Sequence, residues 1–407
     1  MPVVLGLDFG TSSTKLVVRL PFEAGEPTLA VPAQPVCQVD GNAYLWQTVL
    51  WLQETGAFCP WPLEKATVLH TLKQGLIQGN VEKEISELPA GVEVSRVQAG
   101  AAYLAFVIRY AKGWLLHHRP DLFRRRRPVW LLNLGMPAAS YDDPKLAPTF
   151  RRIAAAALHL AGSDGPITVE SVQRFLDKPE VLRSAESKTY AEELGVSVVP
   201  EAAAATTGFA RSTRGNLGLY LMVDVGAMTL DACTFRLKQD SGLHHHYSFM
   251  DAQVRPLGVE SYRWFREQGK THDEFIGQCN LTLRSVVMYT GKKRDPMDGS
   301  WKVGSELPVF LTGGGARNDL HRDIVNDLGP WLSSNAGNGG IRLLDIPAPR
   351  SLDCPVPISD LDRLAVAWGL SYPPDQIGGI EPMSETEDHQ QKTARDWRDG
   401  YVTKEQV

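Results

Sequence analysis

The sequence predicts an α/β protein with two similar halves, and three observations lead to this prediction. A short apolar strand followed by Asp-x-Gly and small hydroxyl residues occurs twice, in Gly6–Lys15 and in Met222–Asp231. A third glycine-rich segment, Phe310–Leu320, follows late in the chain. Two stretches with apolar residues at helical spacing, Ala99–His117 and Phe150–Ala161, are expected to be helices. The repeated strand and turn is the trace of a duplicated fold.

The first strand and turn have the features of a phosphate-binding loop. Residues 3–7 and 16–18 are apolar and are expected to form two strands, with the DFGTSST segment as the turn between them. Gly10 lets the backbone approach a ligand closely, and the N–H groups of such a turn can bind phosphate oxygens. Asp8 ends the strand, where a carboxylate can hold the waters of a Mg²⁺ ion. The candidate phosphate ligands are Gly10, Thr11, Ser12, Ser13 and Lys15.

The middle segment repeats this design. Residues 219–223 are expected to form the strand, and Asp224 and Gly226 begin the turn. A single Asp-x-Gly turn is more often an ordinary hairpin, because these residue types favour turns. Two such turns in one chain, followed by a third glycine segment, favour a nucleotide site instead. The candidate phosphate ligands here are Gly226, Ala227 and Met228, and the candidate catalytic residues are Asp224, Thr229 and Asp231.

The late segment supplies the third part of the predicted site. It has three consecutive glycines after an apolar strand, and close approach of a backbone to a ligand needs residues without a side chain. We expect it to hold the nucleoside while the two turns hold the phosphates. The three segments together predict binding of ATP or ADP with Mg²⁺. The glycines are Gly313, Gly314 and Gly315.

Taken together, these segments resemble the superfamily of actin, heat-shock chaperones and sugar kinases, and most closely the nucleotide-binding domain of the seventy-kilodalton heat-shock chaperones. Linking segments extend the resemblance over roughly residues 1–372. They are Trp130–Asp143, Val198–Ala210, Val254–Phe265 and Arg363–Ser371. The resemblance implies a two-lobed actin-like ATPase fold, with duplicated ribonuclease H-like mixed sheets flanked by helices and with inserted subdomains. No substrate-binding domain like that of the chaperones is expected.

The resemblance also implies roles for individual residues. Asp8 and Asp224 would lie around the Mg²⁺ ion, and Glu201 would help to position the attacking water. Arg317 would lie on the adenine ring, as guanidinium groups do on aromatic faces. Lys73 is the suggested counterpart of the chaperones' catalytic lysine. In-line attack on a phosphate needs mainly positioning and charge neutralisation, so this set implies hydrolysis of ATP to ADP and phosphate.

Two departures from the chaperone pattern affect this expectation. The second turn of the chaperones has three glycines before its threonine, whereas Ala227 and Met228 stand here. Their N–H groups can serve only if neither residue needs positive φ, so turnover is expected to be slow or lost. Lys15 has no counterpart in the chaperones, whereas actin and many sugar kinases carry lysine there.

The motifs divide the chain into lobe I, residues 1–200, and lobe II, residues 201–372. Residues 31–100 are expected to form an inserted subdomain of lobe I, and residues 266–305 a small outer subdomain of lobe II. Residues 373–407 are polar and charged. They are expected to be a flexible tail or a segment that docks a partner.

Composition argues against several other classes of protein. The 407 residues carry a net charge of −5, which does not favour nucleic acid or an anionic membrane as a partner. Five cysteines without close pairing predict reduced thiols in a cytoplasmic protein. Met1 leads directly into the first strand, and no apolar run approaches the length of a membrane span. Neither a leader nor a membrane anchor is therefore expected.

These features leave four functions open. The leading one is a chaperone-like conformational switch, which closes on Mg-ATP, hydrolyses it slowly and acts on a protein partner docked on a lobe surface or on the tail. The second is a small-molecule kinase of the sugar kinase type, with Asp177 or Asp251 as candidate base. The third is an actin-like filament subunit, and the fourth is a nucleotide-binding scaffold without turnover. The partner and the oligomeric state stay open.

Three other groups of residues have simpler explanations. The four arginines at 124–127 suit the end of a helix. His244–His246 suit an exposed hairpin tip better than a metal site. Trp46, Trp51 and Trp61 are expected to form the hydrophobic core of the inserted subdomain, with a binding surface as the alternative.

Overall fold

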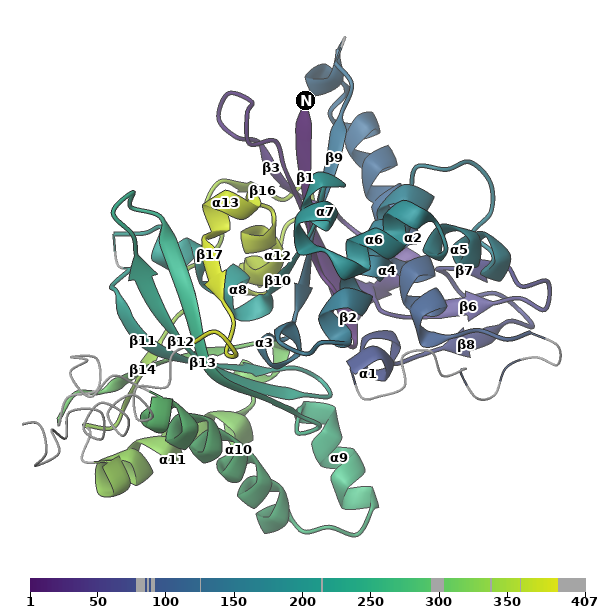
Figure 1. Ribbon diagram of the computed structural model, residues 1–407. Coiled ribbons are helices and arrows are strands. Elements are labelled where there is room, and N and C mark those ends of the chain that lie inside the picture. Colours follow the sequence, from purple (N-terminus) through teal and green to yellow (C-terminus); the bar gives the residue numbers. More distant parts are fainter. Residues whose placement is uncertain are drawn as a thin grey trace, which may run out of the picture. The chain divides into compact units, whose positions relative to one another are not determined.

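The structure is a computed structural model that describes residues 1–77, 85, 88, 92–124, 126–213, 215–293, 304–336, 339–358 and 360–386. The chain forms two compact units, and each contains a mixed sheet with helices packed against it (Figure 1). Unit 1 contains Met1–Arg211 and Pro347–Ile377, and unit 2 contains Ser212–Ile346 and Gly378–Val407. The predicted α/β class is confirmed.

The main sheet of unit 1 combines an antiparallel meander with parallel strands. Its path contains β1 (Pro2–Asp8), β2 (Ser13–Arg19), β3 (Thr28–Ala30), β9 (Val129–Met136), β10 (Val196–Pro200) and β16 (Leu352–Asp353). β1, β2 and β3 pair antiparallel, whereas β9 runs parallel to β1 and β10 runs parallel to β9. The strand order is β10-β9-β1-β2-β3-β16.

The sheet of unit 2 repeats this arrangement. It contains β11 (Gly218–Val225), β12 (Leu230–Gln239), β13 (His245–Arg255), β14 (Leu307–Thr312), β15 (Ile341–Leu344) and β17 (Gly379–Glu381), in the order β15-β14-β11-β12-β13-β17. Again the meander β11-β12-β13 is antiparallel, and β14 and β15 run parallel to β11. The predicted duplication is therefore visible in the strand order. The two Asp-x-Gly turns occupy equivalent points, between β1 and β2 and between β11 and β12.

Helices cover the unit 1 sheet. They are α1 (Leu72–Ile77), α2 (Arg96–His118), α3 (Ala138–Tyr141), α4 (Leu146–Leu160), α5 (Val169–Leu176), α6 (Pro179–Glu186), α7 (Lys188–Glu193), α8 (Glu201–Ala210), α12 (Ala365–Leu370) and α13 (Pro374–Ile377). In Figure 1, α8 and α12 lie on one side of the strands and α2 and α4 on the other. The alanine-rich α4 and the long α2 are the helices expected from apolar spacing, and both face the core of this unit.

The predicted inserted region adds short strands to unit 1. They are β4 (Gln38–Val39), β5 (Asn42–Gln47), β6 (Leu50–Leu52), β7 (Phe58–Cys59) and β8 (Thr67–Leu69). β5 pairs with β2, and β6, β7 and β8 form a small sheet of their own. Trp46 and Trp51 are buried, whereas Trp61 is 42 % exposed. The tryptophans thus divide between the core and the surface.

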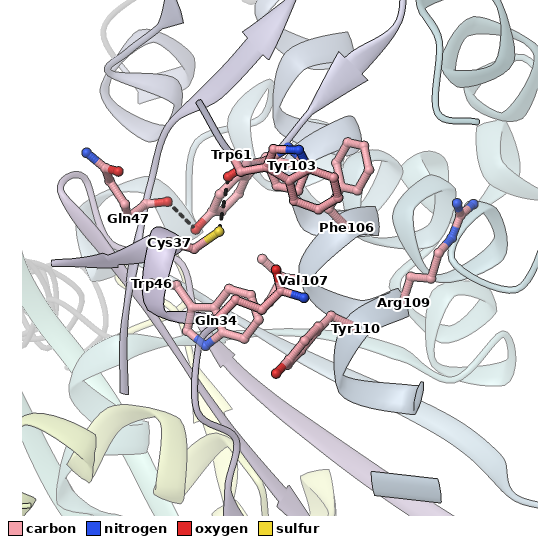
Figure 2. Close-up of a pocket in the computed structure, with 11 residues that line it drawn as sticks. Gln34, Cys37, Trp46, Gln47, Trp61, Tyr103, Phe106, Val107, Arg109 and Tyr110 are labelled. Carbon is pink, nitrogen blue, oxygen red and sulfur yellow. Dashed lines mark hydrogen bonds between the residues drawn. The ribbon is translucent and has the colours of Figure 1, made fainter. Parts of the chain in front are cut away.

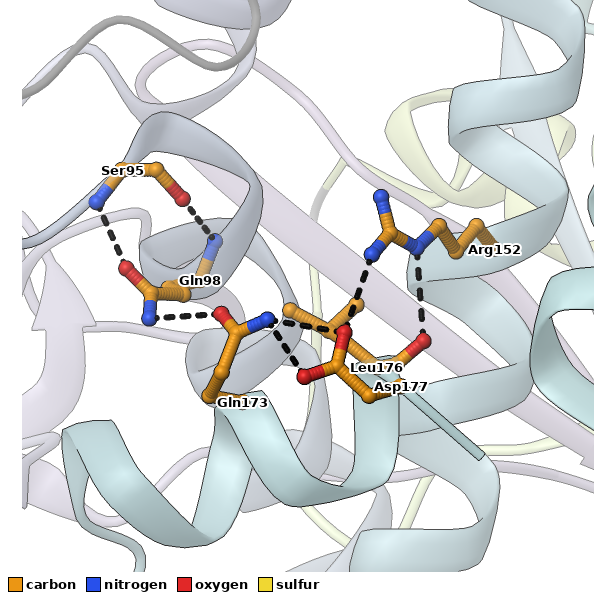
Figure 3. A network of polar contacts seen from close by, with 6 residues as sticks. All are labelled: Ser95, Gln98, Arg152, Gln173, Leu176 and Asp177. Carbon is orange, nitrogen blue, oxygen red and sulfur yellow. Dashed lines mark hydrogen bonds and ion pairs between the residues drawn. The ribbon is translucent and has the colours of Figure 1, made fainter. Parts of the chain in front are cut away.

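A polar network joins α2 to the helices beside it (Figure 3). Ser95 caps α2 by accepting a hydrogen bond from the N–H of Gln98, whose side chain accepts in return from the N–H of Ser95. Gln98 also donates to Gln173, which donates to both carboxylate oxygens of Asp177 at 2.9 Å. Arg152 lies 3.5 Å from Asp177. Asp177 is therefore part of a structural network, which does not favour it as a catalytic base.

Unit 2 has its own helices and its own core. The helices are α9 (Val259–Glu267), α10 (His272–Lys293) and α11 (Asp319–Ala336), and a 3-10 turn, η4 (Gly314–Arg317), precedes α11. α10 packs on β12 and β13, and α11 packs beside α10. Apolar side chains from the sheet and from these helices form one cluster that includes Val223, Phe275 and Leu328.

Ordered structure continues past residue 373, where the sequence predicts a tail. α13 belongs to unit 1, and β17 pairs parallel with β13 in unit 2. Residues 387–407 of the predicted tail lie outside the described residues, as do parts of the predicted subdomains 31–100 and 266–305. None of the described helices has the length and apolar character needed to cross a membrane.

Candidate functional site

The residues predicted for the site fall into two groups, one in each unit. Unit 1 contains Asp8, Gly10, Thr11, Ser12, Ser13, Lys15 and Glu201, and unit 2 contains Asp224, Gly226, Ala227, Met228, Thr229, Asp231, Gly313, Gly314, Gly315 and Arg317. Both groups lie at the carboxyl ends of parallel strands. This is the edge at which open α/β sheets commonly bind ligands.

The first turn joins β1 to β2 and depends on a glycine. The N–H of Gly10 donates to the carbonyl oxygen of Asp8 at 3.1 Å. A Cβ at Gly10 would lie 2.2 Å from the carbonyl oxygen of Ser13, so no other residue fits this turn without a shift. Within the described residues, the N–H groups of Thr11 and Ser12 donate no hydrogen bond. The turn therefore offers two backbone donors to an anion.

Thr48 holds this turn from outside and was not found from the sequence. Its hydroxyl donates to the carbonyl oxygen of Gly10 at 3.0 Å, and its N–H donates to that of Ser12 at 3.1 Å. The hydroxyl of Thr14 lies 3.0 Å from the hydroxyl of Thr48. No local pattern marks Thr48, because these contacts arise only when β5 pairs with β2.

The ammonium group of Lys15 lies against the carboxylate of Asp8. The two residues are direct partners in the β1–β2 ladder, and Lys15 Nζ is 3.0 Å from Asp8 Oδ2. An ammonium group has three N–H donors, so Lys15 can contact a phosphate and keep this ion pair. Asp8 already uses part of its acceptor capacity here, which makes it a less favourable ligand for a metal ion than the sequence suggests.

Glu201, the first residue of α8, forms a buried ion pair with Lys73. Lys73 Nζ lies 2.6 Å from Glu201 Oε1, and both side chains are about nine-tenths buried. Glu201 occupies the first turn of its helix, where the helix dipole favours a negative charge. A Cβ at Gly135, in β9, would lie 3.0 Å from the Cγ of Glu201. The structure thus brings together Lys73 and Glu201, which are 128 residues apart in the chain.

The second turn joins β11 to β12 and is closed by a backbone hydrogen bond from Gly226 to Thr229 at 2.8 Å. Neither Ala227 nor Met228 has positive φ. The side chains that replace the expected glycines therefore introduce no backbone strain. Within the described part of the chain, the N–H groups of Ala227, Met228 and Thr229 donate no hydrogen bond.

The N-terminus of α9 holds the carbonyl side of this turn. Val259 and Glu260 donate their N–H groups to the carbonyl oxygens of Gly226 and Ala227, at 3.1 and 2.7 Å. The hydroxyl of Ser261 donates to the carbonyl oxygen of Met228 at 2.6 Å. The carbonyl groups of the turn are thereby occupied, which leaves its N–H groups for a ligand. Sequence reasoning did not find this support from α9.

Carboxylates gather on the strands on either side of the second turn. Asp224 and Asp231 are direct partners in the β11–β12 ladder, so their side chains lie on the same face of the sheet. Burial raises the pKa of the Cys233 thiol, and the nearby carboxylates of Asp231, Asp224 and Asp251 raise it further. Burial also raises the pKa of Asp251, to about 6. Three carboxyl groups thus lie near the Cys233 thiol in this part of unit 2.

The third glycine segment packs against the second turn. Gly313 has φ +88°, and a Cβ there would lie 2.1 Å from Asp224 Oδ1. A Cβ at Gly315 would lie 2.5 Å from side chains of Val225 and Val259. Two of the three predicted motifs thus lie side by side within unit 2. Gly314 and Arg317 are exposed, so a nucleoside could reach them from solvent.

The histidine run lies at the predicted hairpin: His244 precedes β13, and His245 and His246 are the first two residues of this strand. His246 Nε2 and His244 Nδ1 lie 3.2 and 3.4 Å from Asp240 Oδ2. Among the residues that the structure describes, no group of three or more His, Cys, Asp or Glu side chains is arranged to hold a metal ion. A site for Mg²⁺ would therefore need ligands beyond these side chains, such as phosphate oxygens and waters.

Comparisons with known proteins add little to this geometry. No family model matches the sequence, and no curated protein matches it. Among solved structures, the chain is similar to MreB5 of Spiroplasma citri bound to ADP, with a TM-score of 0.42 and 11 % sequence identity over 91 % of this chain and 95 % of that one. The comparisons do not support a special closeness to the seventy-kilodalton chaperones. The description of the fold stands on its own strand order.

Proposed function

We propose that this protein binds ATP or ADP through its two glycine turns and hydrolyses ATP slowly. The observation that carries the proposal is the equivalence of the turns, which follow the same strand in two sheets of the same order. Each turn presents N–H groups that donate no hydrogen bond among the described residues. One such turn would be an ordinary hairpin. A duplicated pair favours a ligand with several phosphate groups.

Mg²⁺ fits the acidic pair of unit 2 better than it fits Asp8. Asp224 and Asp231 supply two carboxylates on one face of the sheet, whereas Asp8 supplies a single carboxylate, which is paired with Lys15. Proteins commonly hold Mg²⁺ by one or two carboxylates together with substrate phosphates and waters. The bound ion would neutralise charge on the phosphates, and the two carboxylates would repel each other less.

Glu201 is the residue best suited to position a water for attack. Its carboxylate forms an ion pair with Lys73, which fixes the position of the side chain. A carboxylate oriented in this way accepts a hydrogen bond from water in a defined direction. Thr229 and Asp231, at the second turn, are the candidates for contacts with the transferred phosphate and its metal ion.

Thermal unfolding with Mg-ATP, Mg-ADP or Mg-AMP tests the proposal. A ligand at a hundred times its Kd adds ~2.7 kcal/mol to the stability of the folded state, which raises the Tm by several degrees in a chain of this length. We expect a shift with Mg-ATP and Mg-ADP that EDTA reduces, and a much smaller shift with Mg-AMP, which has one phosphate. Equal shifts with all three, or no shift at millimolar nucleotide, would contradict the role of the two turns.

Two finer functions suit such a site, and each has one observation in its favour. The Lys73–Glu201 ion pair agrees with the lysine that the resemblance assigns to the heat-shock chaperones, and favours an ATP-dependent switch that acts on a protein partner. Lys15 beside Asp8 agrees with the lysine of actin, and favours an actin-like subunit. Sedimentation that depends on Mg-ATP supports the subunit. ATP hydrolysis by a protein that does not sediment at any concentration supports the switch.

A further inference from the structure

Unit 1 contains a cavity of about 270 Å³ that none of the proposed nucleotide ligands lines (Figure 2). It lies where the inserted region meets α2. Figure 2 shows Trp61, Tyr103 and Phe106 on one side of the space and Trp46 and Tyr110 on the other. Five aromatic rings from three segments of the chain thus surround one cavity.

The walls of this cavity are held in place by their own contacts. Trp46 donates its indole N–H to the carbonyl oxygen of Val31 at 3.2 Å, and its ring meets that of Tyr110 edge to face with centroids 5.0 Å apart. The hydroxyl of Tyr103 donates to the carbonyl oxygen of Gln47 at 3.1 Å. Rings anchored in this way cannot easily close the space, so the cavity is preformed.

The chemistry of the walls selects an uncharged occupant. Burial raises the pKa of the Cys37 thiol to about 11, so this side chain is neutral. Arg109, at the edge, donates from its two terminal nitrogens to carbonyl oxygens of Leu160, Ser163 and Gly165, and its Nε has no hydrogen-bond partner among the described residues. An apolar cavity of this kind is a poor site for water. Aromatic walls favour a flat ring, which can stack on them or meet them edge to face.

Gln34 offers a polar group to such a ring. This residue lines the cavity, and its side-chain amide makes no hydrogen bond within the described part of the chain. The cavity is slightly smaller than the range of about 300–1,000 Å³ that is typical for drug-sized ligands. Trp61, one of the lining residues, is 42 % exposed, so part of the cavity wall reaches the surface of unit 1. We propose that this cavity binds a small uncharged aromatic molecule of one or two fused rings, with one polar atom bonded to Gln34.

The site is connected to the first phosphate turn through two strands. Trp46 and Gln47 of β5 pair with Thr14 and Ser13 of β2. The next residue, Thr48, donates to the carbonyl oxygen of Gly10. A ring bound against Trp46 therefore contacts the strand that holds the turn. This part of the inference rests on the proposed nucleotide function, and it implies that ring binding and nucleotide binding alter each other's affinity by the same factor.

The binding site is tested on the full chain with indole and naphthalene as probes. The two probes have the same fused-ring shape, but only indole carries an N–H donor. We expect both to bind saturably, as measured by saturation-transfer NMR of the probe. Gln34→Leu removes the amide and keeps a side chain of similar size, so it should weaken indole about fivefold or more and leave naphthalene unchanged. Binding of both probes unchanged in Gln34→Leu would overturn the role of Gln34.

Two further variants show whether the probes occupy this cavity. Val107→Phe adds a ring to the lining and should abolish binding of both probes. Trp264→Ala, which removes a 53 % exposed ring of unit 2, should leave both unchanged. No saturable binding to the parent protein, or loss of binding in Trp264→Ala alone, would overturn the proposal. If Val107→Phe does not fold, the comparison of indole and naphthalene binding in Gln34→Leu still tests whether the probes occupy this cavity.

Coupling to the nucleotide is measured separately. The Kd for Mg-ATP should change about threefold or more at saturating indole, and the Kd for indole should change by the same factor at saturating Mg-ATP. Ring binding without any change in nucleotide affinity would overturn the coupling and leave the ring site standing. Ring binding to a protein that binds no nucleotide would overturn the proposed function instead.

Discussion

In the Lys73–Glu201 ion pair, each buried charge is stabilised by the other. Lys73 lies in the predicted inserted subdomain, residues 31–100, and Glu201 starts a helix far along the chain. Their charged groups are 2.6 Å apart and almost completely buried. Removing one member of such a pair leaves a buried charge without this partner, which is more destabilising than removing both.

We therefore predict that Lys73→Met lowers the free energy of unfolding by about 3 kcal/mol or more, whereas Lys73→Met combined with Glu201→Gln recovers a large part of this loss. Urea denaturation of the two single variants and the double variant forms a complete cycle. Additive effects would show that the pair is not coupled. Glu201→Gln alone should slow ATP hydrolysis and keep the thermal shift with Mg-ATP.

The carboxyl group of Asp251 makes the stability of the folded state depend on pH. Burial raises its pKa to about 6, Lys293 acts in the opposite direction, and Oδ2 has no hydrogen-bond partner among the described residues. Because the folded-state pKa lies above the unfolded value, the folded state binds the proton more tightly. This carboxyl group therefore favours the folded state at low pH, and the contribution is lost as pH rises through about 6.

Asp251→Asn should remove this dependence. We predict that the variant is more stable than the parent at pH values above 7 by about 1–2 kcal/mol, and that the difference disappears as the pH falls towards the unfolded-state pKa. Denaturation curves across this pH range measure the effect. A difference that is independent of pH would show that the carboxyl group titrates normally in the folded protein.

At the scale of elements, the position of each motif depends on which strands and helices are neighbours. β11 and β14 are parallel neighbours, and the glycine segment after β14 meets the turn after β11. Gly313 makes this contact possible, because its φ of +88° and the carboxylate of Asp224 both exclude a side chain. Gly269 has a similar φ, +77°, but a Cβ there would have no neighbour within 4 Å.

The two glycines form a matched pair for mutation. Gly269→Ala should cost about 1 kcal/mol of backbone strain. Gly313→Ala should lower the free energy of unfolding by more than this, because the new Cβ also displaces Asp224. The same variant should weaken binding of Mg-ATP. Urea denaturation and the thermal shift with nucleotide measure the two effects. Equal losses of stability in both variants would show that contact with Asp224 is unimportant.

At the scale of the whole molecule, the two sheets of the same strand order carry one turn each. If both turns serve one nucleotide, a variant in either unit should reduce the nucleotide-dependent shift. We predict that Gly10→Ala, in the first turn, and Gly313→Ala, in the glycine segment packed against the second turn, each weaken binding and strongly reduce the shift with Mg-ATP. Gly113→Ala is a suitable control, because this helical glycine has no neighbour within 4 Å of an added Cβ and alanine favours helices. A shift equal to that of the parent protein in either variant would contradict a shared nucleotide.

Local sequence patterns were enough to locate most of the fold. The apolar spacing of Ala99–His117 and Phe150–Ala161 corresponds to α2 and α4, and each Asp-x-Gly motif lies in a turn between two strands. The class and the duplication follow from such patterns, because strand and helix periods and turn residues are local properties. The boundary at residue 373 was less well located, since β17 is a short strand that exists only through its pairing with β13.

The sequence by itself thus determined the fold class, the duplicated turns and the glycines that they need. Only the tertiary structure decided which groups meet: Lys73 with Glu201, Thr48 with Gly10, and the N-terminus of α9 with the turn at Ala227. It also decided that Ala227 and Met228 are free of positive φ, and that aromatic rings from separate segments enclose a cavity. Such contacts join residues far apart in the chain, so they depend on strand pairing and helix packing and leave no local pattern in the sequence.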